Sequence, residues 1–204
     1  MASLAVRHFC SFASSASFAV KLCGLYVTLN RHPYLVTLTS SPLSRFNDNA
    51  PMPQISRFLP AEADTLAFGA ARAAGLEPGL VIYLTGELGA GKTTLARGLL
   101  RGLGYDGRVK SPSFTLVEPY DLSRLYLYHF DFYRFADPRE LGEAGFREHF
   151  NPNTVCLVEW PEKAAGVVPA ADIRITLQVT GSGRLLEIDA DTEAGRRCLR
   201  KLTQ

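Results

Sequence analysis

Residues 86–93 have the types and spacing that bind phosphate, because they match the pattern G-x-x-x-x-G-K-[ST]. Glycines let backbone N–H groups converge on phosphate oxygens, and a helix starting at Lys92 would point its positive N-terminal end at the same anion. In this pattern the Lys92 amine reaches the terminal phosphates and is the predicted catalytic lysine, while the Thr93 hydroxyl ligates Mg²⁺. The predicted nucleotide contacts are Glu87, Leu88, Gly89, Ala90, Gly91, Lys92, Thr93 and Thr94.

Two carboxylates stand at the ends of strand-like runs, where such a site needs them. Glu159 follows the apolar residues 155–158, and Asp131 ends the alternating run 126–131. The carboxyl ends of parallel strands meet at one crevice, so both acids would face the nucleotide. One would hold Mg²⁺ and the other would orient or deprotonate the attacking water, and the residues leave open which does which. Alternatively, either acid caps a helix or pairs with an arginine such as Arg134.

Some other residues near these motifs have two interpretations, functional and structural. Residues 110–115 stand where many nucleotide hydrolases sense the terminal phosphate, although a turn fixed by a proline explains them equally well. Trp160 either packs beside the nucleotide or belongs to the core. His129 in its alternating strand and Cys156 in mid-strand are interpreted as structural residues.

The surrounding pattern predicts the elements that would position these residues. A buried strand at 79–85 precedes the glycine-rich loop, and a helix from Lys92 to about Gly102 follows it. Helices are also expected at 60–75 and within 137–150. Further strands are expected at 56–58, 115–120, 125–132, 154–160, 173–179 and 184–190. Because alternating strands and helices come first and a hairpin closes the chain, we predict an α/β domain with a mixed sheet.

Charge separates the first fifty residues from the rest of the 204-residue chain. Residues 1–51 carry a net charge of +3, whereas residues 52–204 carry −1. A slightly acidic domain is not typical of a strong nucleic-acid binder, so contact with RNA would need a partner. The four cysteines form no C-x-x-C pair, which argues against a disulfide framework or a zinc site and favours a reducing compartment.

Residues 1–51 are predicted to be an irregular extension, and residues 52–204 a single domain. The extension is Ser-rich and acid-poor, and we expect a misplaced start codon, with Met52 as the true first residue. A targeting segment and a disordered tail are the alternatives. A membrane anchor near residues 9–29 is not favoured, because Lys21 and several serines interrupt the apolar run.

Four motifs, in this order, resemble the TsaE family of bacterial tRNA threonylcarbamoyladenosine biosynthesis ATPases. They are GELGAGKTT, SPSFTLVEPY, HFDFYR and VEWPE, which begin at residues 86, 111, 129 and 158. The resemblance extends over roughly residues 55–190. Ser113 stands where the family usually has threonine, which keeps the hydroxyl, and Phe132 stands where leucine is usual, which changes only packing.

The resemblance implies a P-loop ATPase domain, a three-layer α/β sandwich with a mixed, partly antiparallel central sheet. It implies weak ATP hydrolysis that is stimulated by the transferase pair TsaD and TsaB and resets that pair between turnovers. Contact with tRNA would be indirect, through the pair, and the location cytoplasmic, without membrane contact. The implied Mg²⁺ ligands are Thr93 and Glu159, and Asp131 would serve hydrolysis. Trp160, Glu62 and Thr65 are placed beside the nucleotide.

Two other functions fit the phosphate loop. A small-molecule kinase would pass the phosphoryl group to an acceptor, but such enzymes usually have an arginine-rich lid, and between residues 131 and 150 the chain has only Arg134, Arg139 and Arg147. A nucleotide-dependent interaction module would bind ATP and a partner with little turnover. Stimulation of hydrolysis by the partner complex distinguishes these functions.

Overall fold

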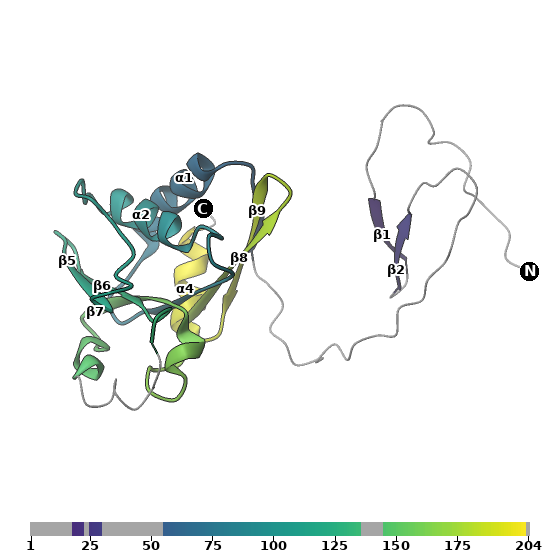
Figure 1. The fold of residues 1–204 in the computed structure, drawn as a ribbon. Helices are drawn as coiled ribbons and strands as arrows, with labels where there is room; N and C mark the ends of the chain where they lie inside the picture. The colour runs from purple at the N-terminus through teal and green to yellow at the C-terminus, as the bar shows by residue number, and fades with distance from the viewer. Residues whose placement is uncertain (1–17, 23–24, 30–54, 136–144, 203–204) are drawn as a thin grey trace, which may run out of the picture. The chain divides into compact units, whose positions relative to one another are not determined.

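The computed structural model describes residues 18–22, 25–29, 55–135 and 145–202 (Figure 1). The chain divides into two compact units, residues 1–48 and 49–204. In the first unit β1 (Phe18–Leu22) and β2 (Leu25–Leu29) pair as an antiparallel hairpin. The sequence analysis expected an irregular extension at residues 1–51 and named no strand there; these two stretches contain the aromatic and β-branched residues that favour strands.

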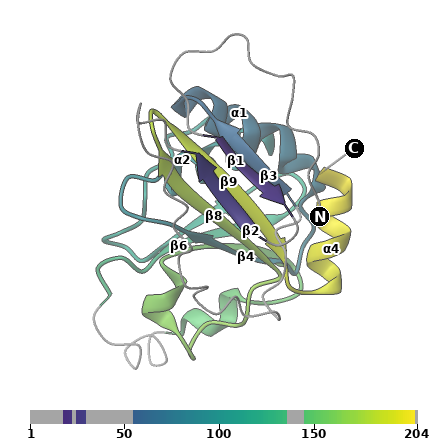
Figure 2. The ribbon, with the colours of Figure 1, turned by 90° about the vertical axis from the view of Figure 1, so that its right-hand side faces the viewer.

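The second unit is built on a seven-stranded mixed sheet in the order β3-β9-β8-β4-β7-β6-β5. Strands β8, β4, β7 and β6 run parallel in its centre, and the flanking strands β9, β3 and β5 pair antiparallel. Figure 2 labels β3, β9, β8, β4 and β6 of this sheet. The mixed α/β sheet predicted from the sequence is confirmed. The strands are β3 (Ile55–Leu59), β4 (Val81–Thr85), β5 (Val117–Asp121), β6 (Tyr126–Asp131), β7 (Thr154–Glu159), β8 (Ile173–Thr180) and β9 (Gly183–Ala190).

In the described part of the chain, three α-helices contribute to the apolar core on one face of the sheet. They are α1 (Glu62–Arg72), α2 (Lys92–Gly102) and α4 (Glu193–Leu202), with the 3-10 turn η1 (Ala73–Gly75) after α1. Residues of these helices share one buried cluster with alternate residues of the central strands, such as Ile82 and Leu84. Among the described residues no helix is both long and apolar enough to cross a bilayer.

The opposite face of the sheet carries a smaller, aromatic cluster. Phe130, Phe132 and Val158 are buried there against residues near η2 (Phe146–His149) and η3 (Pro161–Ala164). Every residue of β7 is buried, because core material covers both of its faces. The central strands are therefore fixed from two sides, and their carboxyl ends are held at defined positions.

Two glycines let the backbones of α1 and α2 touch. A Cβ atom built on Gly98 of α2 would lie 2.3 Å from the carbonyl oxygen of Leu66, and one built on Gly69 of α1 would lie 2.7 Å from that of Leu95. Neither distance is compatible with a side chain. The helix that follows the glycine-rich loop is thereby packed directly onto α1.

The predicted helices differ from the structure at three places. The first was expected to continue to residue 75, but η1 replaces its last turn. Most of the helix predicted within 137–150 falls on residues 136–144, outside the described part, and residues 146–149 form only a 3-10 turn. Helix α4 was not predicted, although Cys198 and Leu199 on it are buried and its other residues are largely polar or charged.

Cys156 and Cys198 are expected to resist alkylation in the folded protein. Both side chains are buried, and burial raises the pKa of the Cys156 thiol to about 12 and that of Cys198 to about 11. A raised thiol pKa keeps the group protonated at pH 8, and only the thiolate reacts. Mass spectrometry after iodoacetamide treatment should find both unmodified in buffer and modified in urea. Equal labelling in both conditions would contradict the described burial.

Candidate functional site

The glycine-rich loop leaves β4 and enters α2 at the carboxyl edge of the sheet. Gly86 adopts φ +134°, and a Cβ atom there would lie 2.2 Å from the Leu177 carbonyl oxygen. Gly91, with φ +106°, is the residue that precedes α2. Only glycine fits both conditions, a left-handed backbone and close approach of another chain segment. The loop therefore turns tightly, and the N-terminus of α2 opens into the pocket beside it.

The Lys92 amine is held at the mouth of this loop. Its Nζ donates hydrogen bonds to the carbonyl oxygens of Gly86, at 2.6 Å, and Glu87, at 2.9 Å. Nζ also lies 4.0 Å from the centre of the Trp160 ring. Burial lowers the pKa of Lys92, while the nearby carboxylates of Glu159 and Asp131 act in the opposite direction. The amine is thus within the loop that would surround phosphate, with partners it can exchange for phosphate oxygens.

Asp131 and Glu159 come together as the parallel strands predict. They are register partners at the ends of β6 and β7, and their exposed fractions are 3% and 2%. Glu159 Oε1 accepts a hydrogen bond of 2.9 Å from the Thr93 hydroxyl. Asp131 accepts one bond from the Ser111 hydroxyl and one of 2.9 Å from the backbone N–H of Tyr133. Neither acid caps a helix, and the guanidinium of Arg134 stacks over the Phe114 ring, 4.2 Å from its centre.

His129 contacts Glu159 of this site, and the sequence analysis did not predict that contact. It is completely buried, and its Nε2 lies 2.9 Å from Glu159 Oε1. The prediction of a structural role did not identify this partner. Alternation along β6 could have found it, because His129 lies two residues before Asp131 and therefore faces the same side of the sheet. His129 and Thr93 together fix one oxygen of the Glu159 carboxylate.

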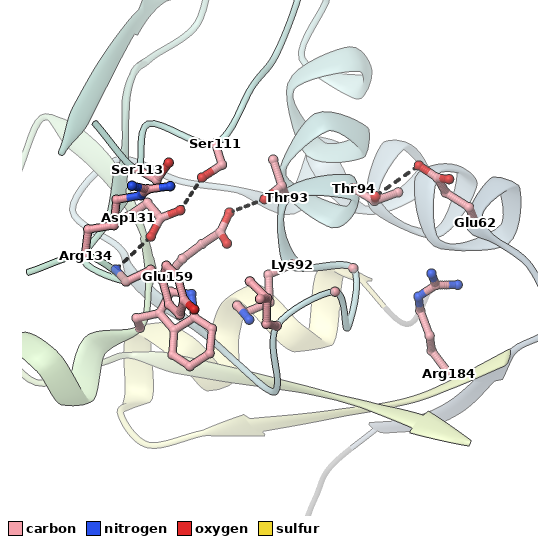
Figure 3. A pocket seen from close by; sticks show the side chains of 15 residues that line it. Glu62, Lys92, Thr93, Thr94, Ser111, Ser113, Asp131, Arg134, Glu159 and Arg184 are labelled. Atoms are coloured by element: carbon pink, nitrogen blue, oxygen red, sulfur yellow. Dashed lines mark hydrogen bonds between the residues drawn. The ribbon is translucent and has the colours of Figure 1, made fainter. Parts of the chain in front are cut away.

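A second group of side chains lies on the other side of the loop (Figure 3). The Thr94 hydroxyl donates to Glu62 Oε1 at 3.2 Å, and Arg97 approaches the same oxygen at 3.4 Å. Arg184, at the start of β9, donates from Nε to the Ala90 carbonyl oxygen at 2.9 Å. No sequence signal identified Arg184, because nothing in the hairpin pattern indicates which of its residues reaches a loop some ninety positions earlier.

These groups surround one cavity of about 620 Å³, a size typical of small-molecule sites. Ser111, Ser113, Tyr133, Arg134 and Arg184 also line it. Three residues expected near the nucleotide do not: Thr65 is completely buried, Ala90 is buried in the core, and Glu87 is exposed outside the lining. The expected site residues that line the cavity are Glu62, Leu88, Gly89, Gly91, Lys92, Thr93, Thr94, Asp131, Glu159 and Trp160.

The oxygen atoms of Thr93 and Glu159 fit a magnesium ion. Mg²⁺ prefers oxygen ligands and, beside a nucleotide, usually needs only one or two protein groups because phosphates and water complete the shell. The two side chains are already within hydrogen-bond distance, and Asp131 adds a third oxygen-bearing group on the neighbouring strand. Within the described ranges no cluster of three His, Cys, Asp or Glu residues could hold a metal alone.

Tryptophan fluorescence should report occupation of this cavity. Trp160 is the only tryptophan of the chain, lines the cavity and touches Lys92. Phosphate would draw the Lys92 amine from the ring, so emission should change and saturate on titration with Mg²⁺-ADP. In the Lys92→Met variant the same titration should give a much weaker response. An equal, saturating response in that variant would mean that Trp160 senses something other than the phosphate site.

Comparison with known proteins identifies the family of this chain. Residues 59–186, more than half of the chain, match the family model described as "Threonylcarbamoyl adenosine biosynthesis protein TsaE". A relative from Haemophilus influenzae, named "tRNA threonylcarbamoyladenosine biosynthesis protein TsaE", is 43% identical over 153 residues, which is 72% of this chain and 97% of that protein. A relative of the same name from Bacillus subtilis is 40% identical over 118 residues, 58% of this chain and 73% of that protein.

The fold has a counterpart among solved structures. The crystal structure of Bacillus subtilis YdiB superposes with a TM-score of 0.65 and is 29% identical in sequence. The match covers 76% of this chain and 97% of the YdiB chain. Family model, relatives and fold therefore agree over the unit that contains the cavity.

Proposed function

The chain belongs to the TsaE family, and on that premise we propose that it is a Mg²⁺-dependent ATP hydrolase. It takes part in threonylcarbamoyladenosine biosynthesis in tRNA, the role for which its relatives are named. The proposal rests on one observation, which is that three groups of residues suited to ATP hydrolysis line the same cavity. The phosphate loop, the Thr93–Glu159 pair and the buried Asp131 line it together.

In the proposed reaction each of these residues has one task. Backbone N–H groups of the loop and the Lys92 amine hold the phosphates, while Thr93 and Glu159 hold the metal. The ion supplies charge neutralisation at the phosphate oxygens when it is bound. Asp131 accepts a proton from the attacking water as a P–O bond forms to the terminal phosphorus. The bond from that phosphorus to the bridging oxygen breaks, and ADP leaves.

The buried position of Asp131 supports this assignment. Its two known hydrogen bonds leave further lone pairs on the carboxylate, so it can still accept from water. Ser111 lines the cavity and contacts Asp131, so residues 110–115 also border the reacting end. Glu159, which shares one oxygen between Thr93 and His129, is better fixed to hold a metal than to exchange protons.

The partners in this proposal are the transferase subunits TsaD and TsaB. Residues 52–204 carry a net charge of −1, so the domain supplies little attraction for tRNA, and contact with tRNA would come through the pair. Hydrolysis would reset the pair between turnovers, and the location is cytoplasmic. The names of the relatives favour this role over phosphoryl transfer to a small acceptor.

The test is ATP hydrolysis by the full chain, alone and with the TsaD–TsaB pair and tRNA. We expect slow phosphate release by the chain alone, a rise when the pair is added, and sustained tRNA modification only when this protein is present. If the rate of ATP hydrolysis is the same with and without the pair, the proposed partners are wrong. The small-molecule kinase function would then be the better explanation of the phosphate loop. Nucleotide binding without turnover under any condition would favour an interaction module.

A further inference from the structure

His129 is a polar ring in an apolar part of the sheet. It is completely buried, and its neighbours on the same face are the completely buried Leu127 on β6 and Leu157, its register partner on β7. The Nδ1 atom of the ring has no hydrogen-bond partner in the described part of the chain. A buried nitrogen without a partner costs free energy that an apolar side chain would not, so packing alone does not explain this ring.

The other ring nitrogen of His129 points to a single function. Nε2 lies 2.9 Å from Oε1 of Glu159, the acid at the end of β7. An ionised carboxylate accepts hydrogen bonds and does not donate them, so Nε2 carries the hydrogen and donates it to Glu159. Since Nδ1 has no partner among the described residues, no second contact competes for the ring. His129 is therefore a donor with one acceptor, held in place by burial.

Thr93 donates to the same oxygen of Glu159, but it is free to leave it (Figure 3). The Thr93 side chain lines the cavity, whereas the His129 ring does not. Rotation about one bond turns a threonine hydroxyl toward another ligand, and the proposed task of Thr93 is to hold the metal. The buried ring has no comparable freedom. Within the described residues no group donates to the second carboxylate oxygen of Glu159, Oε2.

We propose that His129 is a positioning residue, which keeps Oε1 of Glu159 bound to its Nε2–H and so leaves Oε2 as the oxygen available to the metal. This inference rests on the proposed function, because it needs Mg²⁺ held by Thr93 and Glu159. It gives His129 a role in metal binding without direct contact with the ion. Such outer partners orient a ligand and raise its affinity for the metal.

The His129→Phe and His129→Gln variants test the proposal, because phenylalanine removes the N–H donor and the glutamine amide restores one. Calorimetry of the full chain should measure ADP binding in excess Mg²⁺ and in EDTA. The ratio of the two affinities reports how much the metal site adds. We expect this ratio to fall roughly 10-fold or more in His129→Phe, the loss typical of removing such a partner. ADP affinity in EDTA should stay within about twofold of the wild type, and His129→Gln should recover most of the ratio.

Other results overturn the positioning role. An unchanged ratio in His129→Phe, or an equal loss of ADP affinity with and without Mg²⁺, would make His129 a packing residue only. A His129→Gln variant as impaired as His129→Phe would exclude the donated hydrogen bond. If Mg²⁺ does not strengthen ADP binding to the wild type, the proposed function itself fails.

A matched control and a measurement on the wild type complete the test. His149→Phe makes the same change in a histidine that stacks on Tyr128, outside the cavity lining, and should keep the wild-type ratio. Nitrogen-15 NMR of the nucleotide-free full chain, assigned by comparison with His129→Gln, should find the hydrogen of the His129 ring on Nε2. A hydrogen on Nδ1 instead would overturn the proposal even if His129→Phe does not fold.

Discussion

The Asp131→Asn variant is expected to lose ATP hydrolysis by a factor of roughly 100 or more, because an amide cannot accept the proton of the attacking water. Nucleotide should still bind. The amide oxygen can accept the Tyr133 N–H as the carboxylate does, and the amide nitrogen can donate to Ser111, so both contacts survive. Phosphate release with the TsaD–TsaB pair and calorimetry with Mg²⁺-ATP measure the two quantities separately.

The control for this experiment is Asp121→Asn, an exposed acid at the end of the neighbouring strand β5. It removes the same charge outside the cavity, and both activity and binding should remain. If Asp131→Asn instead abolishes Mg²⁺-ATP binding, Asp131 belongs to the metal shell. Glu159 would then be the candidate for proton transfer.

The Gly98→Ala variant should be less stable than the wild type by about 1–3 kcal/mol in the free energy of unfolding, the usual cost of overpacking a tight contact. Intrinsic helix propensity predicts the opposite sign, because alanine is favoured over glycine in a helix by about 1 kcal/mol. The new Cβ atom would lie 2.3 Å from the Leu66 carbonyl oxygen, and backbone cannot rotate away as a side chain could. Urea denaturation followed by circular dichroism gives the sign directly.

Arg101→Ala serves as the comparison for Gly98→Ala, because Arg101 is exposed on the same helix. There alanine should change the free energy of unfolding by less than about 0.5 kcal/mol. A stabilised Gly98→Ala variant would mean that α1 and α2 separate easily, contrary to the packing described above.

Most of the sheet could be predicted because its signals are local. The apolar runs at β4 and β7 stand between glycines or turns, and alternation identifies β8 and β9. Helix α4 escaped prediction because only a few of its residues enter the core, among charged ones. The hairpin of β1 and β2 escaped because its short runs are surrounded by serine-rich sequence.

The site residues, like the strands and helices, could be predicted only where the signal lies within one short segment of the sequence. Motif spacing and strand ends indicate Lys92, Thr93 and the two acids within single segments, and the structure places all four around one cavity. Arg184 and the contact of His129 with Glu159 depend on how distant segments meet. Thr65 shows the converse: it lies on the correct helix, one turn after Glu62, yet its side chain is completely buried. Position in the sequence does not determine which side of a helix faces a cavity.

The place of β4 in the sheet has a consequence for synthesis of the chain. This strand, which leads into the phosphate loop, pairs with β7 on one side and β8 on the other. Strands β8 and β9 are synthesised after the other five strands of this sheet. A nascent chain that ends before residue 173 therefore presents its complete phosphate-binding motif on a sheet that lacks one of the two neighbours of β4. We therefore expect nucleotide to stabilise the domain only after translation has passed this hairpin, and binding to chains stalled at successive lengths should appear abruptly beyond residue 190.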